Sequence, residues 1–178
     1  MSDGYLEIVV GPMFSGKTTK LIETFYQLNK PNIQIKVINY SLDKRYDDNK
    51  LSTHDQWKIN CEFHSDLNNI DVSNTDIILI NEAQFFPDLK NIVLRWVEQE
   101  NKDVRLYGLD GDYKRQTFGE MLDLIPYSNS IHKLYARCSV CSMPAIYSHR
   151  VSNEQTQIVI GSSNYLSLCR KCYQTHNT

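Results

Sequence analysis

Apolar runs alternate with amphipathic segments along the first 130 residues of the chain. Residues 5–10 form an apolar run that becomes β-branched toward its end, which predicts a buried strand. After residue 18 the apolar positions recur at helical spacing, at Leu21, Ile22, Phe25 and Leu28. Residues 34–40 then alternate as a strand does. Because a strand, a helix and a second strand in this order form a βαβ unit, we expect a parallel sheet.

Further elements follow along the same part of the chain. Residues 76–80 are the clearest apolar run and predict a core strand. A helix is expected after Pro87, a strand at residues 104–109, and a short helix at residues 118–125 that the following proline ends. The stretch 42–74 is polar and weakly patterned, and its charged part indicates a loop.

The composition changes after residue 130. The remaining segment carries four of the five cysteines and short β-like runs at residues 145–151 and 157–160. We therefore expect residues 1–130 to form an α/β domain, with a mainly parallel sheet, flanking helices and a glycine-rich phosphate-binding loop (P-loop) at residues 11–18. Residues 131–178 are expected to form a small, β-rich, zinc-binding lobe.

The overall composition is that of an ordinary soluble globule, and it argues against several classes of protein. At 178 residues the chain is one domain, or one domain with a small appendage. Its 19 basic and 21 acidic residues give a net charge of −2, which disfavours a nucleic-acid partner. No apolar run approaches the ~20 residues of a membrane span. The first residues lack the features of a signal peptide, so a cytoplasmic location is expected.

The segment between the first predicted strand and helix matches the phosphate-binding pattern G-x-x-x-x-G-K-[ST]. Its residues are Gly11, Pro12, Met13, Phe14, Ser15, Gly16, Lys17 and Thr18. The glycines let backbone N–H groups surround phosphate oxygens, and the following helix presents its positive N-terminus. Lys17 is expected to reach the β- and γ-phosphates, and the Thr18 hydroxyl to take Mg²⁺. A chance match on a glycine-containing loop is the weaker interpretation, because the flanking strand and helix are those the motif requires.

The strand at residues 76–80 runs into two polar residues, Asn81 and Glu82. Ligands of open α/β sheets bind at the carboxyl ends of strands, where Glu82 could take a proton from an attacking hydroxyl. The alternative is a strand-end carboxylate that only hydrogen-bonds a turn. Asn81 stands where an aspartate usually helps to hold Mg²⁺. Since an amide brings no charge, we expect Mg²⁺ binding to be somewhat weakened.

Two Cys-x-x-Cys pairs lie in the C-terminal segment, and they comprise Cys138, Cys141, Cys169 and Cys172. Four thiolates can surround one tetrahedral ion and leave no open position, which favours a structural zinc site. Reduced core cysteines or a redox dithiol are the alternatives. Cys61 is left over and is expected to be a plain thiol.

Together these motifs make the chain resemble the thymidine kinases of the cellular and poxviral type. The resemblance covers nearly the whole chain and includes Gly11–Thr18, Asp43–Tyr46, Thr53–Asp55, Glu82–Asp88, Leu109–Gly111 and the two cysteine pairs. It implies phosphorylation of the 5′-hydroxyl of thymidine by ATP with Mg²⁺, which gives thymidine monophosphate and ADP. It also implies feedback inhibition by thymidine triphosphate and a homotetramer.

The resemblance also implies a role for individual residues. Glu82 would be the general base, and the residues near the phosphates and the reacting hydroxyl would be Asp43, Lys44, Arg45, Asn81 and Gln84. The base and sugar would be met by Met13, Phe85, Leu109, Tyr113, Phe118, Ser148 and Tyr165. A loop called the lasso would close over the base, with Gln157, Ile158, Val159, Ile160 and Gly161. Without the resemblance, Phe85, Leu109 and Phe118 could each simply be buried.

Three further functions are compatible with these motifs. A different pyrimidine deoxynucleoside could be the substrate, because the family reads the base mainly through backbone groups. The protein could also be a nucleic-acid-stimulated P-loop ATPase or a non-catalytic nucleotide-binding module.

Besides Asn81, the chain departs from the family pattern in two places. Tyr113 stands where phenylalanine is common, and residues 161–165 are one residue shorter than usual.

Overall fold

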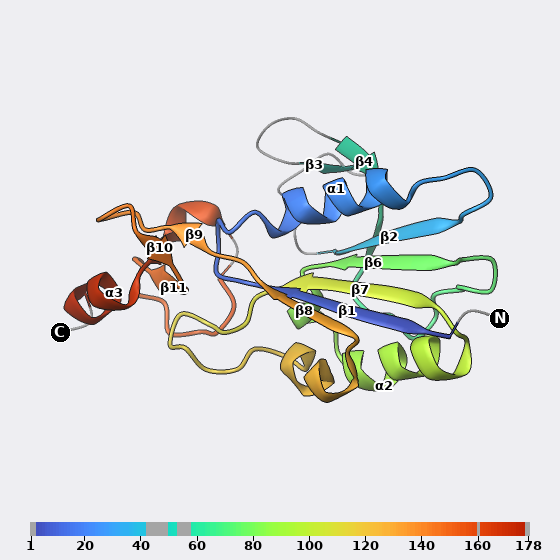
Figure 1. Cartoon of the computed structure of the whole chain (residues 1–178). Coiled ribbons are helices and arrows are strands. Elements are labelled where there is room, and N and C mark those ends of the chain that lie inside the picture. The colour runs from blue at the N-terminus through green and yellow to red at the C-terminus, as the bar shows by residue number, and fades with distance from the viewer. Residues whose placement is uncertain (1–2, 42–49, 53–57, 160, 177–178) are drawn as a thin grey trace.

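The computed structural model describes residues 3–41, 50–52, 58–159 and 161–176. A six-stranded sheet forms its centre, in the order β5-β2-β6-β7-β1-β8 (Figure 1). The strands are β1 (Tyr5–Val10), β2 (Ile35–Tyr40), β5 (Glu62–His64), β6 (Ile77–Asn81), β7 (Asp103–Gly108) and β8 (Ser130–Lys133). Every neighbouring pair in this sheet is parallel. The predicted α/β class with a mainly parallel sheet is therefore confirmed.

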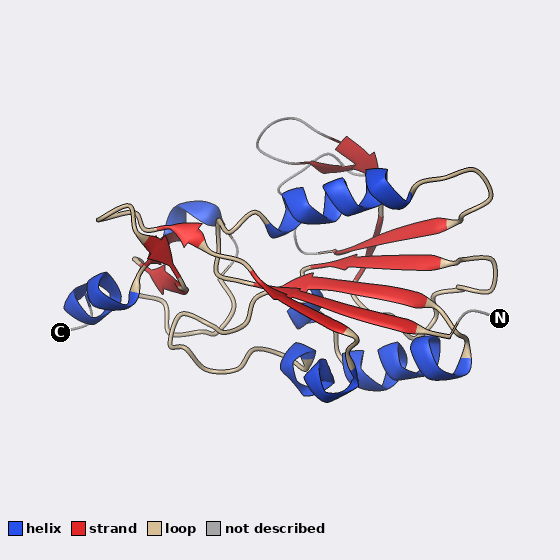
Figure 2. Ribbon diagram, in the orientation of Figure 1, coloured by secondary structure: helices blue, strands red, loops and turns tan. Residues whose placement is uncertain are grey.

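Helices cover both faces of the sheet, as Figure 2 shows. Helix α1 (Lys17–Leu28) packs on one face, and α2 (Leu89–Leu94) on the other, continued by the π-helical turn η2 (Arg95–Gln99). Strand β6 is buried throughout and contributes side chains to the apolar clusters on both faces of the sheet. Ile78 and Ile80 pack with α2, whereas Ile77 and Leu79 pack with α1. Since a strand turns successive side chains to opposite faces, its unbroken apolar run is what a strand covered on both sides requires.

Three short strands lie among the described residues of the polar stretch 42–74, whose weak pattern predicts no strand. Strands β3 (Lys50–Ser52) and β4 (Lys58–Asn60) pair antiparallel, and β5 joins the edge of the large sheet. Three-residue strands carry too few positions for a period to be visible. The charged residues 43–49 lie outside the described residues.

The helix predicted at residues 118–125 is wrong in type and limits. A 3₁₀ helix, η3 (Met121–Tyr127), stands there instead and contains Pro126. It begins late because Gly119 has φ of +62°, and an added Cβ there would lie 2.2 Å from the backbone oxygen of Gln84. The fixed φ of proline is compatible with a 3₁₀ turn, so Pro126 does not end the element.

The C-terminal segment forms a small separate layer off the carboxyl ends of the sheet strands (Figure 1). Its elements are β9 (Ala136–Arg137) paired with β10 (Pro144–Ala145), β11 (Tyr147–Arg150) paired with β12 (Tyr165–Leu168), the 3₁₀ turn η4 (Ser162–Asn164), and helix α3 (Arg170–His176). A second short 3₁₀ turn, η1 (Ala83–Phe85), belongs to the sheet domain and follows β6. The large sheet continues past residue 130 through β8, and Leu134 N–H still donates to Val10 O at 2.7 Å.

One of the two β-like runs predicted in this lobe is wrong. The run 145–151 corresponds to β10 and β11, but residues 157–159 are irregular, and residue 160 is not described. The carbonyls of Gln157 and Val159 accept hydrogen bonds from side chains, so this stretch makes no ladder. The strand that pairs with β11 is β12.

No helix within the described residues is long and apolar enough to cross a membrane.

Candidate active site

The glycine-rich loop turns from β1 into α1 at the carboxyl edge of the sheet. Lys17 is 8% exposed, and its Nζ donates to the carbonyls of Gly11 at 3.1 Å and Pro12 at 2.8 Å. Gly16 precedes α1 with φ of +80°, and no side chain caps the helix there. The first N–H groups of α1 therefore stay available for an anion at the positive end of the helix.

Crowding explains the first glycine of this loop. A Cβ on Gly11 would lie 2.7 Å from Ser15 Oγ and 2.8 Å from the backbone oxygen of Leu134. Ser15 Oγ itself is buried and has no hydrogen-bond partner within the described ranges. A buried hydroxyl without a partner is costly, and a phosphate oxygen in the loop would supply one.

Glu82 follows directly on β6 in a strained conformation. Its φ is +52°, in the left-handed region that costs a non-glycine residue about 1–3 kcal/mol. Gln84 Nε2 donates to Glu82 Oε2 at 2.7 Å, while Gln84 Oε1 accepts from Leu109 N–H at 3.0 Å. Gln84 is 2% exposed, so it fixes the Glu82 carboxylate against the end of β7.

Asn81 pairs with an asparagine that was not singled out from the sequence. Its Nδ2 donates to Asn39 Oδ1 at 2.9 Å, and the two residues face each other across β2 and β6. Both are buried, and Asn39 Nδ2 has no partner among the described residues. An uncharged amide pair thus stands at the strand ends.

The predicted base and sugar residues fall into two groups. Phe85 and Phe118 meet edge to face with centroids 5.2 Å apart, and Tyr40 stacks on the other side of Phe85 at 5.1 Å. Leu109 joins this group through its bond to Gln84. The second group lies where residues of the sheet domain meet the lobe.

Residues of the second group form hydrogen bonds with the described part of the predicted lasso and with the residues next to it. Tyr113 hydroxyl donates to Gln155 O at 3.2 Å, Gln157 Nε2 donates to Asp112 Oδ2 at 3.0 Å, and Tyr165 hydroxyl donates to Val159 O at 3.1 Å. Met13 N–H donates to Ser148 Oγ at 2.9 Å and so ties the glycine-rich loop to β11. The structure therefore joins the lobe to both the lasso and the glycine-rich loop.

The other predicted site residues are exposed or half-buried, or lie outside the described residues. Ile158 is exposed, and Gly161 has φ of +127°, a conformation that favours glycine. Thr18 lies half-buried in the first turn of α1. The undescribed candidates are Asp43, Lys44, Arg45 and Ile160.

Sequence reasoning missed three buried polar residues, Asn39, Asp112 and Arg150. Asp112 Oδ1 accepts from the N–H groups of Lys114 and Gln116 and shapes their turn. Ser148 and Arg150 occupy the buried phase of β11, and this phase is visible only in the structure, where Tyr147 and His149 are half-buried. Polar residues in the inward phase of a strand point to a polar site.

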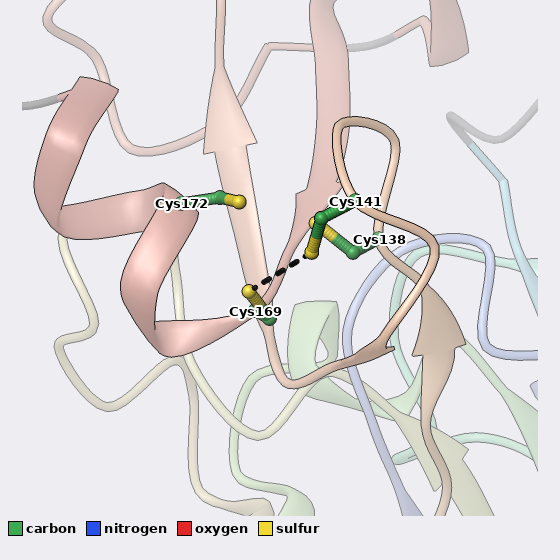
Figure 3. Close-up of side chains that lie close together, drawn as sticks. All are labelled: Cys138, Cys141, Cys169 and Cys172. Atoms are coloured by element: carbon green, nitrogen blue, oxygen red, sulfur yellow. Dashed lines mark hydrogen bonds between the residues drawn. The ribbon is translucent and has the colours of Figure 1, made fainter.

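The four paired cysteines come together in the lobe, as Figure 3 shows. Their sulfur atoms all lie within 4.8 Å of one another, and Cys141 Sγ is 3.6 Å from Cys169 Sγ. Sulfurs around a tetrahedral zinc ion lie about 3.8 Å apart. The donor set and its spacing therefore fit one metal ion held by four thiolates.

The surroundings of these thiols shift their pKa values in opposite directions. Burial opposes ionisation of Cys138, but N–H groups of Cys141, Cys169 and Val140 outweigh it and lower the Cys138 pKa to about 6. The hydrogen bond with Cys141 and burial raise the pKa of Cys172 to about 12. Because the thiolate is the form that binds a metal, a cation held here would displace the remaining thiol protons. Cys61 lies in the sheet core, where burial raises its pKa to about 11.

A parallel sheet, a glycine-rich loop between β1 and α1, and a four-cysteine lobe at the same edge define a member of the P-loop class of α/β proteins. Comparison with known proteins narrows this class. The family model described as Thymidine kinase matches residues 4–173. The chain belongs to the thymidine kinase family, as the motifs predicted, and is thus a kinase.

Relatives from viruses and plants share this similarity. A thymidine kinase of Yaba monkey tumor virus is 39% identical over 96% of this chain and 94% of its own length. One of vaccinia virus (strain Ankara) is 38% identical over 97% of this chain and 98% of its own. A rice thymidine kinase is 36% identical over 96% of this chain, which spans 66% of the rice protein.

Proposed function

We propose that the protein transfers the γ-phosphoryl group of ATP to the 5′-hydroxyl of thymidine and releases thymidine monophosphate and ADP. The observation that carries this proposal is the match to the thymidine kinase family over residues 4–173. The glycine-rich loop follows β1 and Glu82 follows β6, and the lobe lies off the same carboxyl ends of the strands, which supports a shared site for two substrates (Figure 1).

Glu82 is the proposed general base. Its carboxylate accepts the proton of the 5′-hydroxyl while that oxygen bonds to the γ-phosphorus, and the bond from phosphorus to the departing ADP oxygen breaks. The hydrogen bond from Gln84 orients the carboxylate for this transfer. The strained backbone of Glu82 supports the same assignment, because strain is retained where function needs a fixed geometry.

The glycine-rich loop is the proposed phosphate site. Backbone N–H groups at the start of α1 and the hydroxyl of Ser15 would bind phosphate oxygens, and Lys17 would offset their charge. The Thr18 hydroxyl and the Asn81 amide are oxygen donors of the kind that Mg²⁺ prefers. Bound there, Mg²⁺ would neutralise charge on the β- and γ-phosphates.

The lobe is the proposed nucleoside side of the site. Its metal is proposed to be zinc with a structural role, since four thiolates leave no position for a substrate. Family resemblance further supports a homotetramer and inhibition by thymidine triphosphate, whose base and phosphates would occupy both halves of the site.

The direct test is a nucleoside panel. Purified protein with ATP and Mg²⁺ should convert thymidine to thymidine monophosphate faster than it phosphorylates deoxycytidine or deoxyuridine. If another nucleoside were phosphorylated faster than thymidine, that nucleoside would become the proposed substrate. DNA-dependent hydrolysis of ATP to ADP and phosphate, with no nucleoside monophosphate formed from any nucleoside, would overturn the proposal in favour of a nucleic-acid-stimulated ATPase.

A further inference from the structure

Arg150 makes an unusual set of contacts at the end of β11. The residue is 6% exposed, and its guanidinium donates to three backbone carbonyls of one loop. Nη1 donates to Glu154 O at 3.0 Å and to Thr156 O, and Nη2 donates to Gln157 O at 2.8 Å. One side chain thus gathers three points of the segment 154–159, called here the lasso segment.

The same guanidinium also binds two tyrosines. It donates to the Tyr165 hydroxyl from Nη2 at 2.6 Å and from Nε at 3.2 Å, and it lies over the Tyr113 ring, 3.8 Å from the centroid. Tyr165 in turn donates to Val159 O at 3.1 Å, which adds a fourth carbonyl of the lasso segment to the network.

No carboxylate within the described ranges forms an ion pair with Arg150. The Glu154 carboxylate attracts Arg150 at longer range, but the buried cation has no carboxylate in direct contact, which is costly. Carbonyl dipoles, a phenol and an aromatic face help to offset its charge. Only a planar group with five N–H donors can serve these partners together, since a lysine has one nitrogen. The arrangement is therefore specific to arginine.

The lasso segment has little else to hold its backbone. In the described part of the chain, no backbone-to-backbone hydrogen bond joins residues 152–159 to another segment. Residues 154–158 are exposed. The path of this backbone is fixed mainly by side chains, with Arg150 the one that reaches most carbonyls.

We propose that Arg150 is a positioning residue that holds the lasso segment in its nucleoside-binding shape before any nucleoside arrives. This inference rests on the proposed function, in which the lobe forms the nucleoside side of the site, and on the prediction that Tyr113, Tyr165 and residues 157–161 meet the nucleoside. Arg150 acts through these groups and contacts neither ATP nor the reacting hydroxyl. Because a preformed loop lowers the ordering cost of binding, removal of Arg150 should weaken nucleoside binding selectively.

Steady-state kinetics of Arg150→Met and Arg150→Lys test this role. Loss of the hydrogen bonds to a charged group should raise the thymidine KM ~10- to 100-fold in Arg150→Met, with kcat and the ATP KM within about threefold of the parent enzyme. Arg150→Lys keeps the charge and the stem, and should fall between the parent and the methionine variant. Arg95→Met, a change on the sheet domain far from the loop, serves as the matched control and should leave all three constants unchanged.

A second readout needs no activity. Without nucleoside, the glutamate-specific protease should cut after Glu154 at least ~10-fold faster in Arg150→Met than in the parent or in Arg95→Met, as mass spectrometry of the fragments would show. Should Arg150→Met fail to fold, Arg150→Lys still provides both readouts. An unchanged thymidine KM, or equal cleavage at Glu154 in variant and parent, would overturn the role of Arg150. Failure of the parent enzyme to phosphorylate thymidine would instead overturn the proposed function, and the cleavage rates would still decide about Arg150.

Discussion

The sheet domain and the cysteine lobe are held together by different forces. Two extended apolar clusters, one on each face, fill the sheet domain. Among its described residues, the lobe has one small buried cluster, formed by Ala136, Cys138, Ala145, Leu168 and Tyr173. Because a core this small supplies little hydrophobic free energy, we infer that the metal proposed for the four thiolates would supply much of the folding energy of the lobe. The comparison separates the two halves of the proposed site: the phosphate side should survive loss of the metal, whereas the nucleoside side should not.

Glu82→Gln should give the largest change in rate and leave both regions folded. The amide keeps the shape of the side chain but cannot accept the proton, so kcat should fall ~10²–10⁴-fold. Metal content and the midpoint of thermal unfolding should match the parent enzyme. A variant that retains kcat within a few-fold would show that another group takes the proton.

Cys141→Ser should affect only the lobe, because it changes one of the four predicted metal ligands. Cys141 is exposed, so its replacement removes a ligand without opening a core cavity. If four ligands share the ~10–16 kcal/mol of a structural zinc site, loss of one should weaken metal binding ~10²-fold or more. Competition with a chelator measures this affinity. The matched control is Cys61→Ala, which removes a buried thiol from the sheet cluster and should leave metal affinity unchanged.

Gln84→Met tests how the sheet domain orients its carboxylate. The change removes the bond to Glu82 and leaves Leu109 N–H without its acceptor, so kcat should fall ~10-fold and stability by about 1–3 kcal/mol. Rate measurements and denaturant unfolding follow both effects. Gln99→Met, at an exposed position of η2, should change neither.

Asn81→Asp should have the smallest effect. A carboxylate at this position adds a charge for Mg²⁺, and Asn39 can turn its unpaired Nδ2 toward it. The Mg²⁺ concentration that gives half-maximal rate should fall about three- to tenfold. An activation curve identical to that of the parent enzyme would mean that residue 81 serves only the pair with Asn39.

Local patterns predict much of this molecule. The strand β6, the placement of the glycine-rich loop between β1 and α1, and the pairing of the cysteines all follow from residues close together in sequence. These features are set by periodicity or by a fixed spacing of chemical groups, which a single segment displays.

The parts that could not be predicted depend on distant segments. Strand β12 forms because Tyr165–Leu168 finds β11 as its partner, and the lasso segment stays irregular because Arg150 and Tyr165 take its carbonyls. The helix η3 begins only at Met121 because Gly119 lies against the backbone of Gln84, a residue far away in sequence. Neither propensity nor a motif records such contacts, so the role of Arg150 emerged only from the structure.

Calorimetric titration of the metal-depleted enzyme with each substrate tests the central claim most directly. After removal of the metal by a chelator, ATP with Mg²⁺ should bind with nearly the affinity of the untreated enzyme, whereas thymidine binding should be lost and should return when zinc is added back. Equal loss of both ligands, or thymidine binding that survives metal removal, would contradict the division of the site between sheet and lobe.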